Sequence, residues 1–191
     1  MGRYAALVCQ ELGMKVIAIS DVTGGITNPK GIDITAIFSH STLATVENEE
    51  RVNAGEVLEM KCNVLIPAAL GGVITDSNCG KINADFIIEG ANQPLTISAD
   101  LELRGQGVII VPDILANSGG VMGSYFEWTQ NIQEFSWPIE KFRRELDERM
   151  EKSFANVHKV SKKYSVDLRT AAFIVSVERV AHAFELRGSL V

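Results

Sequence analysis

Three polar side chains, Asp21, Asn92 and Asn117, each follow a short apolar run of the sequence and are candidates for contacts with a polar ligand. A carboxylate accepts hydrogen bonds from sugar hydroxyls, and a carboxamide both donates and accepts them. The same residue types also start turns and cap helices. A turn before Gly24 is therefore an equal alternative for Asp21, and a helix cap is a serious alternative for Asn117. Ser124 adds a hydroxyl group, although an ordinary helix serine is the commoner role.

Nucleophilic and metal chemistry find little support in the remaining residues. Cys9, Cys62 and Cys79 are odd in number and form no Cys-x-x-Cys pair, which predicts free thiols in a reducing compartment. The three histidines are far apart and have no ligand-type neighbours at metal-binding spacing. No Gly-x-Ser-x-Gly motif and no Cys–His pair is present. We therefore expect no metal site.

The elements that must position these groups are four apolar runs and the helix-like stretches around them. The runs are continuous rather than alternating, which is typical of strands buried on both faces of a parallel sheet. They cover residues 16–20, 63–66, 85–88 and 108–111, and the helix-like stretches cover residues 4–12, 33–40, 53–60 and 96–104. This alternation predicts an α/β fold with a doubly wound, mostly parallel Rossmann-type sheet, in which ligands bind beyond the carboxyl ends of the strands.

The last third of the sequence predicts two long helices at about residues 138–187. The first begins near Pro138 and carries apolar residues at three- and four-residue steps; these are Ile139, Phe142, Leu146, Met150, Phe154, Val157 and Val160. The second runs from Asp167, a candidate N-cap, to Arg187, with Gly188 as its stop. Its predicted buried face consists of Phe173, Val177, Val180 and Phe184.

Length and composition indicate a globular domain. The 191 residues include 46% hydrophobic and 22% charged residues, and their net charge is −6. The negative charge argues against a broad nucleic-acid or membrane surface. No apolar run approaches the roughly 20 residues of a membrane helix, and the first residues do not form a secretory signal. We expect a cytoplasmic protein, with the mitochondrial matrix as the alternative.

Six segments taken together are more specific than any single residue. They are GGITNPKGIDI (24–34), LIPAAL (65–70), IIEGANQP (87–94), VPDILANSGGV (111–121), SYFEWTQN (124–131) and DLRTAAF (167–173). In order and spacing they resemble the C-terminal, nucleotide-binding domain of the glutamate dehydrogenase family. The resemblance covers essentially the whole chain, so we expect residues 1–191 to be the NAD(P)-binding domain of such an enzyme.

This resemblance implies an activity and a set of binding residues. The family oxidatively deaminates L-glutamate to 2-oxoglutarate and ammonia with NAD or NADP, and it is usually a homohexamer. The implied cofactor-binding residues are Gly2, Asp21, Ala68, Ala69, Asn92 and Asn117. The implied substrate-binding residues are Val121 and Ser124, with Ser124 touching the side-chain carboxylate of glutamate. Asp21 would repel a 2′-phosphate, which favours NAD, while NADP stays open.

The sequence also departs from the family pattern. The first strand of the nucleotide-binding fold, its first two loop glycines and the substrate domain, which in the family carries the catalytic lysine and aspartate, are not found in it. The resemblance therefore assigns no catalytic residue, and we expect a fragment that is inactive alone. Ser118 stands where the family often has alanine, and Gly123 where a β-branched residue is common.

Two alternative functions stay open at this stage. One is a branched-chain or aromatic amino-acid dehydrogenase of the same superfamily, against which Ser124 and the aromatic segment 125–128 argue. The other is a nucleotide-binding module without catalytic activity.

Overall fold

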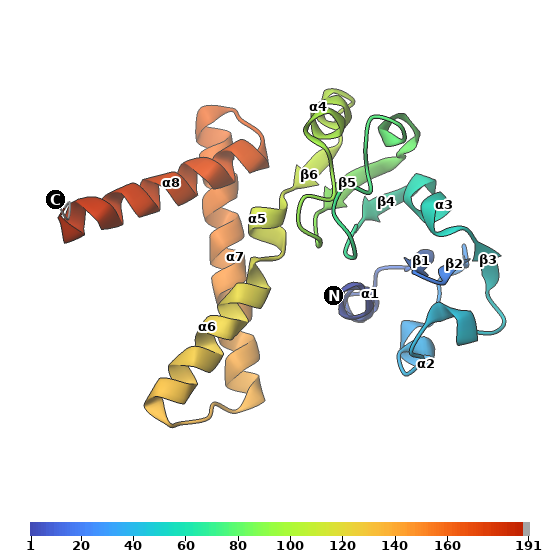
Figure 1. Cartoon of the computed structure of the whole chain (residues 1–191), viewed down its shortest axis with the longest axis horizontal. Coiled ribbons are helices and arrows are strands. Elements are labelled where there is room, and N and C mark those ends of the chain that lie inside the picture. The colour runs from blue at the N-terminus through green and yellow to red at the C-terminus, as the bar shows by residue number, and fades with distance from the viewer. Residues whose placement is uncertain (189–191) are drawn as a thin grey trace. The chain divides into compact units, whose positions relative to one another are not determined.

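A computed structural model describes residues 1–188 of the chain. The chain divides into two compact units, Met1–Ile109 and Ile110–Val191, each of which is described by itself (Figure 1). Each unit contains helices and strands that were predicted from the sequence and others that were not.

The first sheet of unit 1 is antiparallel, which corrects one prediction. Its strands are β1 (Ala18–Asp21), β2 (Gly24–Thr27) and β3 (Glu50–Val52), in the order β1-β2-β3. The run at residues 16–20 was predicted to lie in the parallel sheet, but β1 forms a hairpin with β2 instead. The physical reason is the two-residue connection Val22–Thr23, which is too short for a crossover between parallel strands.

Helices α1 (Gly2–Glu11) and α2 (Ile34–Ile37) pack beside this sheet, followed by the short helix η1 (Leu43–Thr45) and by α3 (Ala54–Glu59). Their core contains Ile26, Ile32, Ile34 and Val46, with partly buried residues of α1 and β1 around it. The predicted helix starts are confirmed by their caps. Asp33 accepts a hydrogen bond from the Ala36 amide at the start of α2, and Asn53 forms a capping box with Glu56 at the start of α3.

The second sheet confirms the predicted parallel α/β arrangement. It contains β4 (Cys62–Leu65), β5 (Ala84–Ile88) and β6 (Ile109–Val111), in the order β4-β5-β6, and β4 runs parallel to β5. Each strand coincides with a predicted apolar run. The helices η2 (Cys79–Lys81) and α4 (Ile97–Gly105) lie between its strands in the sequence, and the Thr96 side chain caps α4 by accepting from the Ala99 amide.

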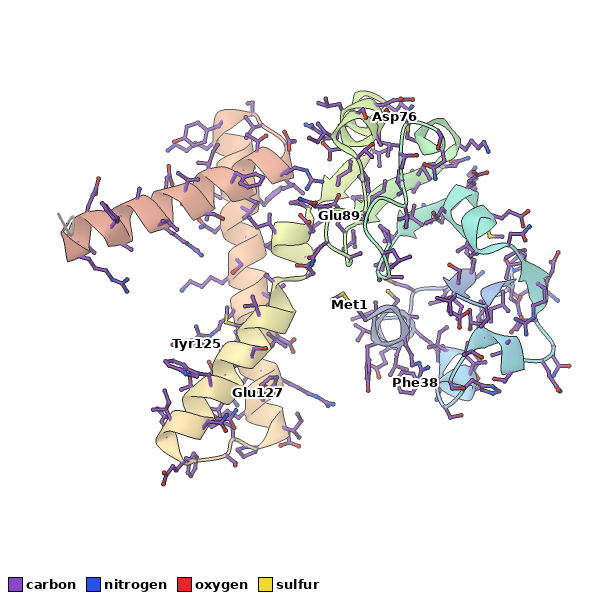
Figure 2. The ribbon with its side chains drawn as sticks, viewed as in Figure 1. Met1, Phe38, Asp76, Glu89, Tyr125 and Glu127 are labelled. Atoms are coloured by element: carbon purple, nitrogen blue, oxygen red, sulfur yellow. The ribbon has the colours of Figure 1, made fainter. Side chains whose placement is uncertain are left out.

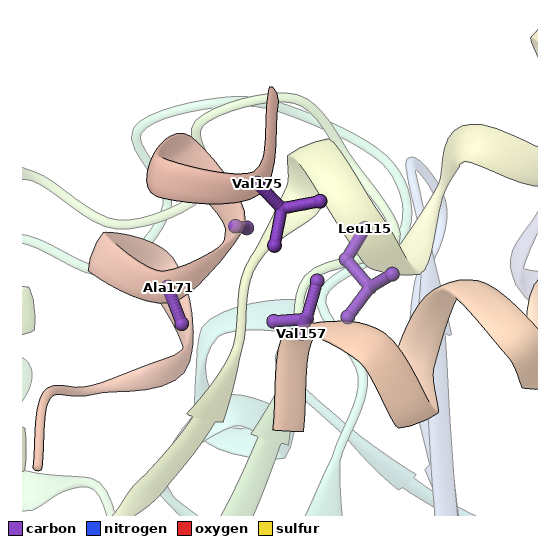
Figure 3. Packing of buried hydrophobic residues seen from close by; sticks show 5 residues of the cluster. Leu115, Val157, Ala171 and Val175 are labelled. Carbon is purple, nitrogen blue, oxygen red and sulfur yellow. The ribbon is translucent and has the colours of Figure 1, made fainter. Parts of the chain in front are cut away.

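Unit 2 is mainly helical and confirms the two predicted long helices. It contains α5 (Asp113–Ala116), α6 (Ser118–Gln133), α7 (Ile139–Tyr164) and α8 (Leu168–Arg187). Asp167 caps α8 by accepting from the Thr170 amide, as predicted. Figure 3 shows the core, in which α5, α7 and α8 meet; its buried residues are Leu115, Val157, Ala171, Ala172 and Val175.

The predicted buried face of α8 is wrong. Phe173, Val177, Val180 and Phe184 are 54%, 63%, 71% and 61% exposed. The first turns of α8 pack on α7 through Ala171, Ala172 and Val175 instead, and the remainder of α8 extends away from α7 (Figure 1). Small side chains therefore make the helix contact, while the larger apolar residues lie on the outer side of the same helix.

Candidate functional site

The N-terminus of α1 lies against the loops that follow β4 and β5. A β-carbon placed on Gly2 would be 3.6 Å from the β-carbon of Ala68, and one placed on Gly90 would be only 3.0 Å from it. The sulfur of Met1 also reaches this contact, 3.4 Å from the position of a Gly90 β-carbon (Figure 2). Three segments that are distant in the sequence therefore meet through residues with minimal side chains.

Main-chain hydrogen bonds join the two loops to each other. The Ala91 amide donates to the Pro67 carbonyl at 2.8 Å, and the Gly72 amide donates to the Gln93 carbonyl at 2.8 Å. Further along, the Ile74 amide donates to Pro94 at 2.9 Å, next to an isolated parallel bridge between Ile74 and Leu95. The loops are thus held much as paired strands are, although they carry no regular strand at this point.

Gly71 lies in close contact with the loop that follows β5. A β-carbon at Gly71 would be 2.8 Å from the Asn92 carbonyl oxygen and 3.4 Å from the Gln93 carbonyl oxygen. Both neighbours are main-chain atoms, which cannot rotate away as a side chain can. The contact with Gly71 involves the main chain of Asn92, while Asn92 as a whole is an exposed residue at the surface.

The start of α1 could hold an anionic group. The first amides of a helix have no partner within the helix, and they attract anions. Residue Met1 at the N-cap of α1 makes no side-chain cap, and the first turn of α1 contains no acidic residue. With Gly2, Ala68 and Gly90 beside it, the backbone of the helix start is accessible to a phosphate at close range.

Asp21 lies at the end of β1, in the antiparallel sheet. Its Oδ1 accepts from the Thr23 amide at 2.7 Å and from the Thr23 hydroxyl at 2.5 Å, and its Oδ2 accepts from the Leu43 amide at 2.8 Å. Partial burial acts to raise the pKa of this carboxyl, but these hydrogen bonds and the charge of Arg51 outweigh it, so the pKa lies below its ordinary value of 3.8. Asp21 is therefore ionised and connects the hairpin turn to η1. The turn role proposed as an alternative is present.

Two arginines hold the segment that follows α2. Arg3 of α1 donates to the His40 carbonyl at 2.8 Å, and its guanidinium lies 5.7 Å from the centre of the Phe38 ring. Arg51 of β3 donates to the carbonyls of Ala44 and Val46 at 3.0 and 2.9 Å. The segment that contacts Asp21 is thus fixed from both sides by cations.

Asn117 forms the junction between two helices of unit 2. Its backbone has φ −101° and ψ 4°, so it ends α5 and precedes α6, and its side chain makes no cap on α6. The Gly120 amide donates to the Asn117 carbonyl at 3.2 Å. The alternative of a side-chain helix cap is therefore not what the structure shows, although Asn117 does stand at the cap position.

Val121 and Ser124 lie on an exposed face of α6. Val121 is 71% exposed, and the Ser124 hydroxyl donates to the Gly120 carbonyl at 3.3 Å, which is a long bond within the helix. The rings of Tyr125 and Trp128 continue this face with their centres 5.8 Å apart, and Figure 2 shows Tyr125 projecting from α6. Apolar, aromatic and hydroxyl groups are thus presented together.

The structure brings some of the predicted site residues together within each unit. In unit 1, Gly2 and Ala68 meet, Asn92 lies on the adjoining loop, and Ala69 is exposed on the loop after β4. In unit 2, Asn117, Val121 and Ser124 lie at and within the first two turns of α6. That the amides of Asn92 and Asn117 face one cleft stays a prediction.

The sequence interpretation missed Gly90 and Gly71, whose close contacts shape the loops. The available signal was a glycine close after the apolar run 85–88, because such a position often marks close backbone approach. Arg3 was also missed, since its role depends on a carbonyl 37 residues away in the sequence.

Within residues 1–188, no three His, Cys, Asp or Glu side chains are grouped so that they could hold a metal ion. No helix of this part of the chain is both long enough and apolar enough to span a membrane.

Comparison with known proteins decides the family. The model of the glutamate/leucine/phenylalanine/valine dehydrogenase family matches residues 1–188. The chain belongs to this family. It is accordingly a member of a family of amino-acid dehydrogenases, which are oxidoreductases, and the predicted resemblance is confirmed.

Individual relatives agree with this assignment. The glutamate dehydrogenase of Thermotoga maritima is 46% identical over 193 aligned positions, covering 98% of this chain and 46% of the relative. A solved structure of a hetero-hexameric glutamate dehydrogenase from Thermus thermophilus, in a leucine-bound form, is 30% identical and covers all of this chain and 46% of its own, with a TM-score of 0.89. The glutamate dehydrogenase of Peptoniphilus asaccharolyticus is 30% identical, covers 98% of this chain and 44% of its own, and has a TM-score of 0.79. The chain therefore spans about half the length of the relatives it matches.

Proposed function

We propose that the protein acts in the oxidative deamination of L-glutamate to 2-oxoglutarate and ammonia with a nicotinamide dinucleotide, and that residues 1–191 supply its cofactor-binding domain. The observation that carries this proposal is the close approach of Gly2, at the start of α1, and of Gly90 to the same residue, Ala68. In an open α/β fold, a helix N-terminus beyond the carboxyl ends of parallel strands is where a dinucleotide phosphate binds. The named relatives are glutamate dehydrogenases, which supports the same reaction.

The residues of unit 1 would hold the cofactor. Gly2 and the α1 amides face a phosphate, Ala68 and Ala69 pack against the dinucleotide, and Asn92 binds near the nicotinamide ribose. Asp21 is ionised, and one of its acceptor positions remains after three internal hydrogen bonds. Its charge disfavours a 2′-phosphate, so we propose NAD as the preferred cofactor.

The residues of unit 2 would orient the substrate against that cofactor. Asn117 faces the nicotinamide and the substrate, Val121 contacts the aliphatic part of glutamate, and the Ser124 hydroxyl donates to its side-chain carboxylate. When bound, the nicotinamide accepts the hydride from the substrate α-carbon, so the protein supplies binding and orientation. We assign no catalytic acid or base to this chain.

The test measures whether the natural protein forms NADH when a substrate is added. Absorbance at the reduced-nicotinamide band is followed with glutamate, norvaline, leucine and phenylalanine, each with NAD and with NADP. We expect kcat/KM for glutamate with NAD to exceed that of every apolar amino acid at least tenfold. A preference for leucine, valine or phenylalanine would place the protein with the other amino-acid dehydrogenases of the family, and binding of NAD without turnover of any substrate would support a module without catalysis.

We also propose that the protein forms a homo-oligomer, with a hexamer as the assembly. The Thermus thermophilus relative is described as hetero-hexameric, and the exposed apolar faces of α6 and α8 provide surface that an assembly can cover. Light scattering on the natural protein would give six times the subunit mass. A monomeric mass at micromolar concentration would contradict this part of the proposal.

A further inference from the structure

Helix α6 rests on α7 through two glycines. A β-carbon on Gly123 would be 3.3 Å from the Cζ atom of Phe142, and one on Gly119 would be 3.8 Å from the Met150 sulfur and 3.9 Å from a Leu146 methyl group. The first distance is tighter than an ordinary van der Waals contact, while the other two are ordinary. The separation of the two helices is therefore set at Gly123 by the missing side chain and by the Phe142 ring.

The Phe142 ring is half-buried and is held on one side by a buried aromatic ring. It packs edge-on against Phe126, with the ring centres 5.5 Å apart, and Phe126 is only 1% exposed. The Arg149 guanidinium lies 5.3 Å from the centre of the Phe126 ring. A larger residue at position 123 would consequently push α6 away from α7 rather than simply rotate one ring.

The proposed substrate residues lie on the other side of the same helix. Successive residues of an α-helix turn by about 100°, so Gly119, Gly123 and Phe126 share the face toward α7, while Val121 and Ser124 point away from it. Both of the latter are exposed. Any displacement of α6 therefore moves Val121 and Ser124 with it.

We propose that Gly123 is a positioning residue that, together with Phe142, sets the place of Val121 and Ser124 and thereby the selectivity for a substrate with a side-chain carboxylate. The inference rests on the proposed function. A hydrogen bond to a carboxylate weakens steeply when its distance or angle departs from the optimum, so a shift of a fraction of an ångström at Ser124 affects glutamate more than an apolar amino acid. Gly123 touches neither substrate nor cofactor in this scheme.

The experiment uses the natural protein with the substitutions Gly123→Val, Phe142→Leu and the two combined. For each variant, kcat and KM are measured with glutamate and with norvaline, which lacks the side-chain carboxylate. We expect Gly123→Val to lower the glutamate-to-norvaline ratio of kcat/KM at least tenfold, mainly through the KM for glutamate. Phe142→Leu alone should change the ratio less than threefold, and the double variant should return it to within threefold of the unsubstituted protein.

Gly55→Ala is the matched control, because Gly55 also lies in a helix and has no atom within 4 Å of its β-carbon position. It should leave the ratio unchanged. Fluorescence of Trp128 and Trp137, the two tryptophans of the chain, reports whether α6 and α7 remain packed. Should Gly123→Val fail to fold, Gly123→Ala replaces it, with an expected threefold fall in the ratio and recovery by Phe142→Leu.

The outcomes separate this inference from the proposed function. If the unsubstituted protein forms no NADH with glutamate, the proposed function fails and this inference fails with it. If glutamate is turned over but folded Gly123→Val or Gly123→Ala keeps the ratio, or if Phe142→Leu does not restore it, only the positioning role of Gly123 is overturned.

Discussion

Asp21 shows how one carboxylate serves local structure at the same position where a cofactor contact is expected. Its two oxygens accept from Thr23 and from Leu43, so the side chain joins a hairpin turn to a helix 22 residues later. A ribose hydroxyl would add a further hydrogen bond to a group that is already fixed. The residue is thus positioned before any ligand binds, which lowers the entropic cost of binding.

Asp21→Asn should destabilise the fold by about 1 kcal/mol at neutral pH, because an amide NH₂ group can then face the Leu43 amide as one donor facing another. The folded-state pKa of Asp21 lies below its ordinary value of 3.8. The stabilisation is therefore fully present above about pH 5 and is lost as the pH falls through 3.8 toward the folded-state value. Thermal unfolding at several pH values should show a Tm difference that is constant from pH 8 to about pH 5 and shrinks below pH 4. A difference that grows on acidification would contradict this role.

Ser124→Val should reduce kcat/KM for glutamate about ten- to a hundredfold, since the loss of a hydrogen bond to a charged group costs about 1.5–3 kcal/mol. Norvaline has no side-chain carboxylate for Ser124 to bind, so its kcat/KM should change much less. Steady-state kinetics with both substrates make the comparison. Equal losses for the two would show that Ser124 does not read the side-chain carboxylate.

At the scale of elements, the sequence predicted those strands and helices whose signals are local. Continuous apolar runs located β4, β5 and β6. The helix-like stretches beginning at Asn53 and Thr96 and the candidate N-cap Asp167 located helix starts. The hairpin β1–β2 was not predicted, because its first strand is as continuously apolar as a parallel strand. The turn residues Asp21 and Gly24, three positions apart, were the signal that could have indicated it.

The buried side of α8 could not be predicted from periodicity alone. Its larger apolar residues define one face, but α7 and α5 contact another face made of alanine and valine. Periodicity says which residues lie together on a helix, and it does not say which neighbour covers them. Which residues Gly2, Gly71 and Gly90 contact could not be predicted for the same reason, since each contact is with a segment distant in sequence.

Gly71→Ala should force the loops after β4 and β5 apart, because the new β-carbon would lie 2.8 Å from the Asn92 carbonyl oxygen. We expect a destabilisation of about 1–3 kcal/mol from overpacking, together with weaker NAD binding. Urea unfolding and calorimetry measure the two effects. Gly105→Ala is the control, because its β-carbon position has no atom within 4 Å, and it should change stability by no more than about 0.5 kcal/mol.

Leu115→Ala should lower stability by about 2–4 kcal/mol, since Leu115 of α5 is only 5% exposed and fills the core shared with α7 and α8. Because α5 ends at Asn117, the same change should loosen the start of α6. Leu101→Ala, at a residue 58% exposed, is the matched control and should have little effect. Similar costs for both substitutions in denaturant unfolding would mean that the cluster does not act as a core.

At the scale of the whole molecule, the proposed binding residues are divided between two units that have their own cores. Gly2, Ala68 and Asn92 belong to the first unit, and Asn117 and Ser124 belong to the second. No linker-like composition marks this division in the sequence, because the boundary falls inside strand β6 rather than in a loop. Composition could therefore indicate a globular protein without indicating two units.

The main-chain hydrogen bonds between the loops after β4 and β5 should slow the exchange of their amide protons with solvent. Surface loops normally exchange their amide protons within seconds, yet the amides of Gly72, Ile74, Ala91 and Thr96 each donate to a main-chain carbonyl. Deuterium uptake should therefore be slow in these four amides, close to that of strand β5, while the amide of the exposed loop residue Asp76 exchanges rapidly. Because this protection comes from backbone atoms, substitutions of Leu70 or Gln93 should leave it intact, and a protein can change the exposed side chains of these loops while keeping their shape.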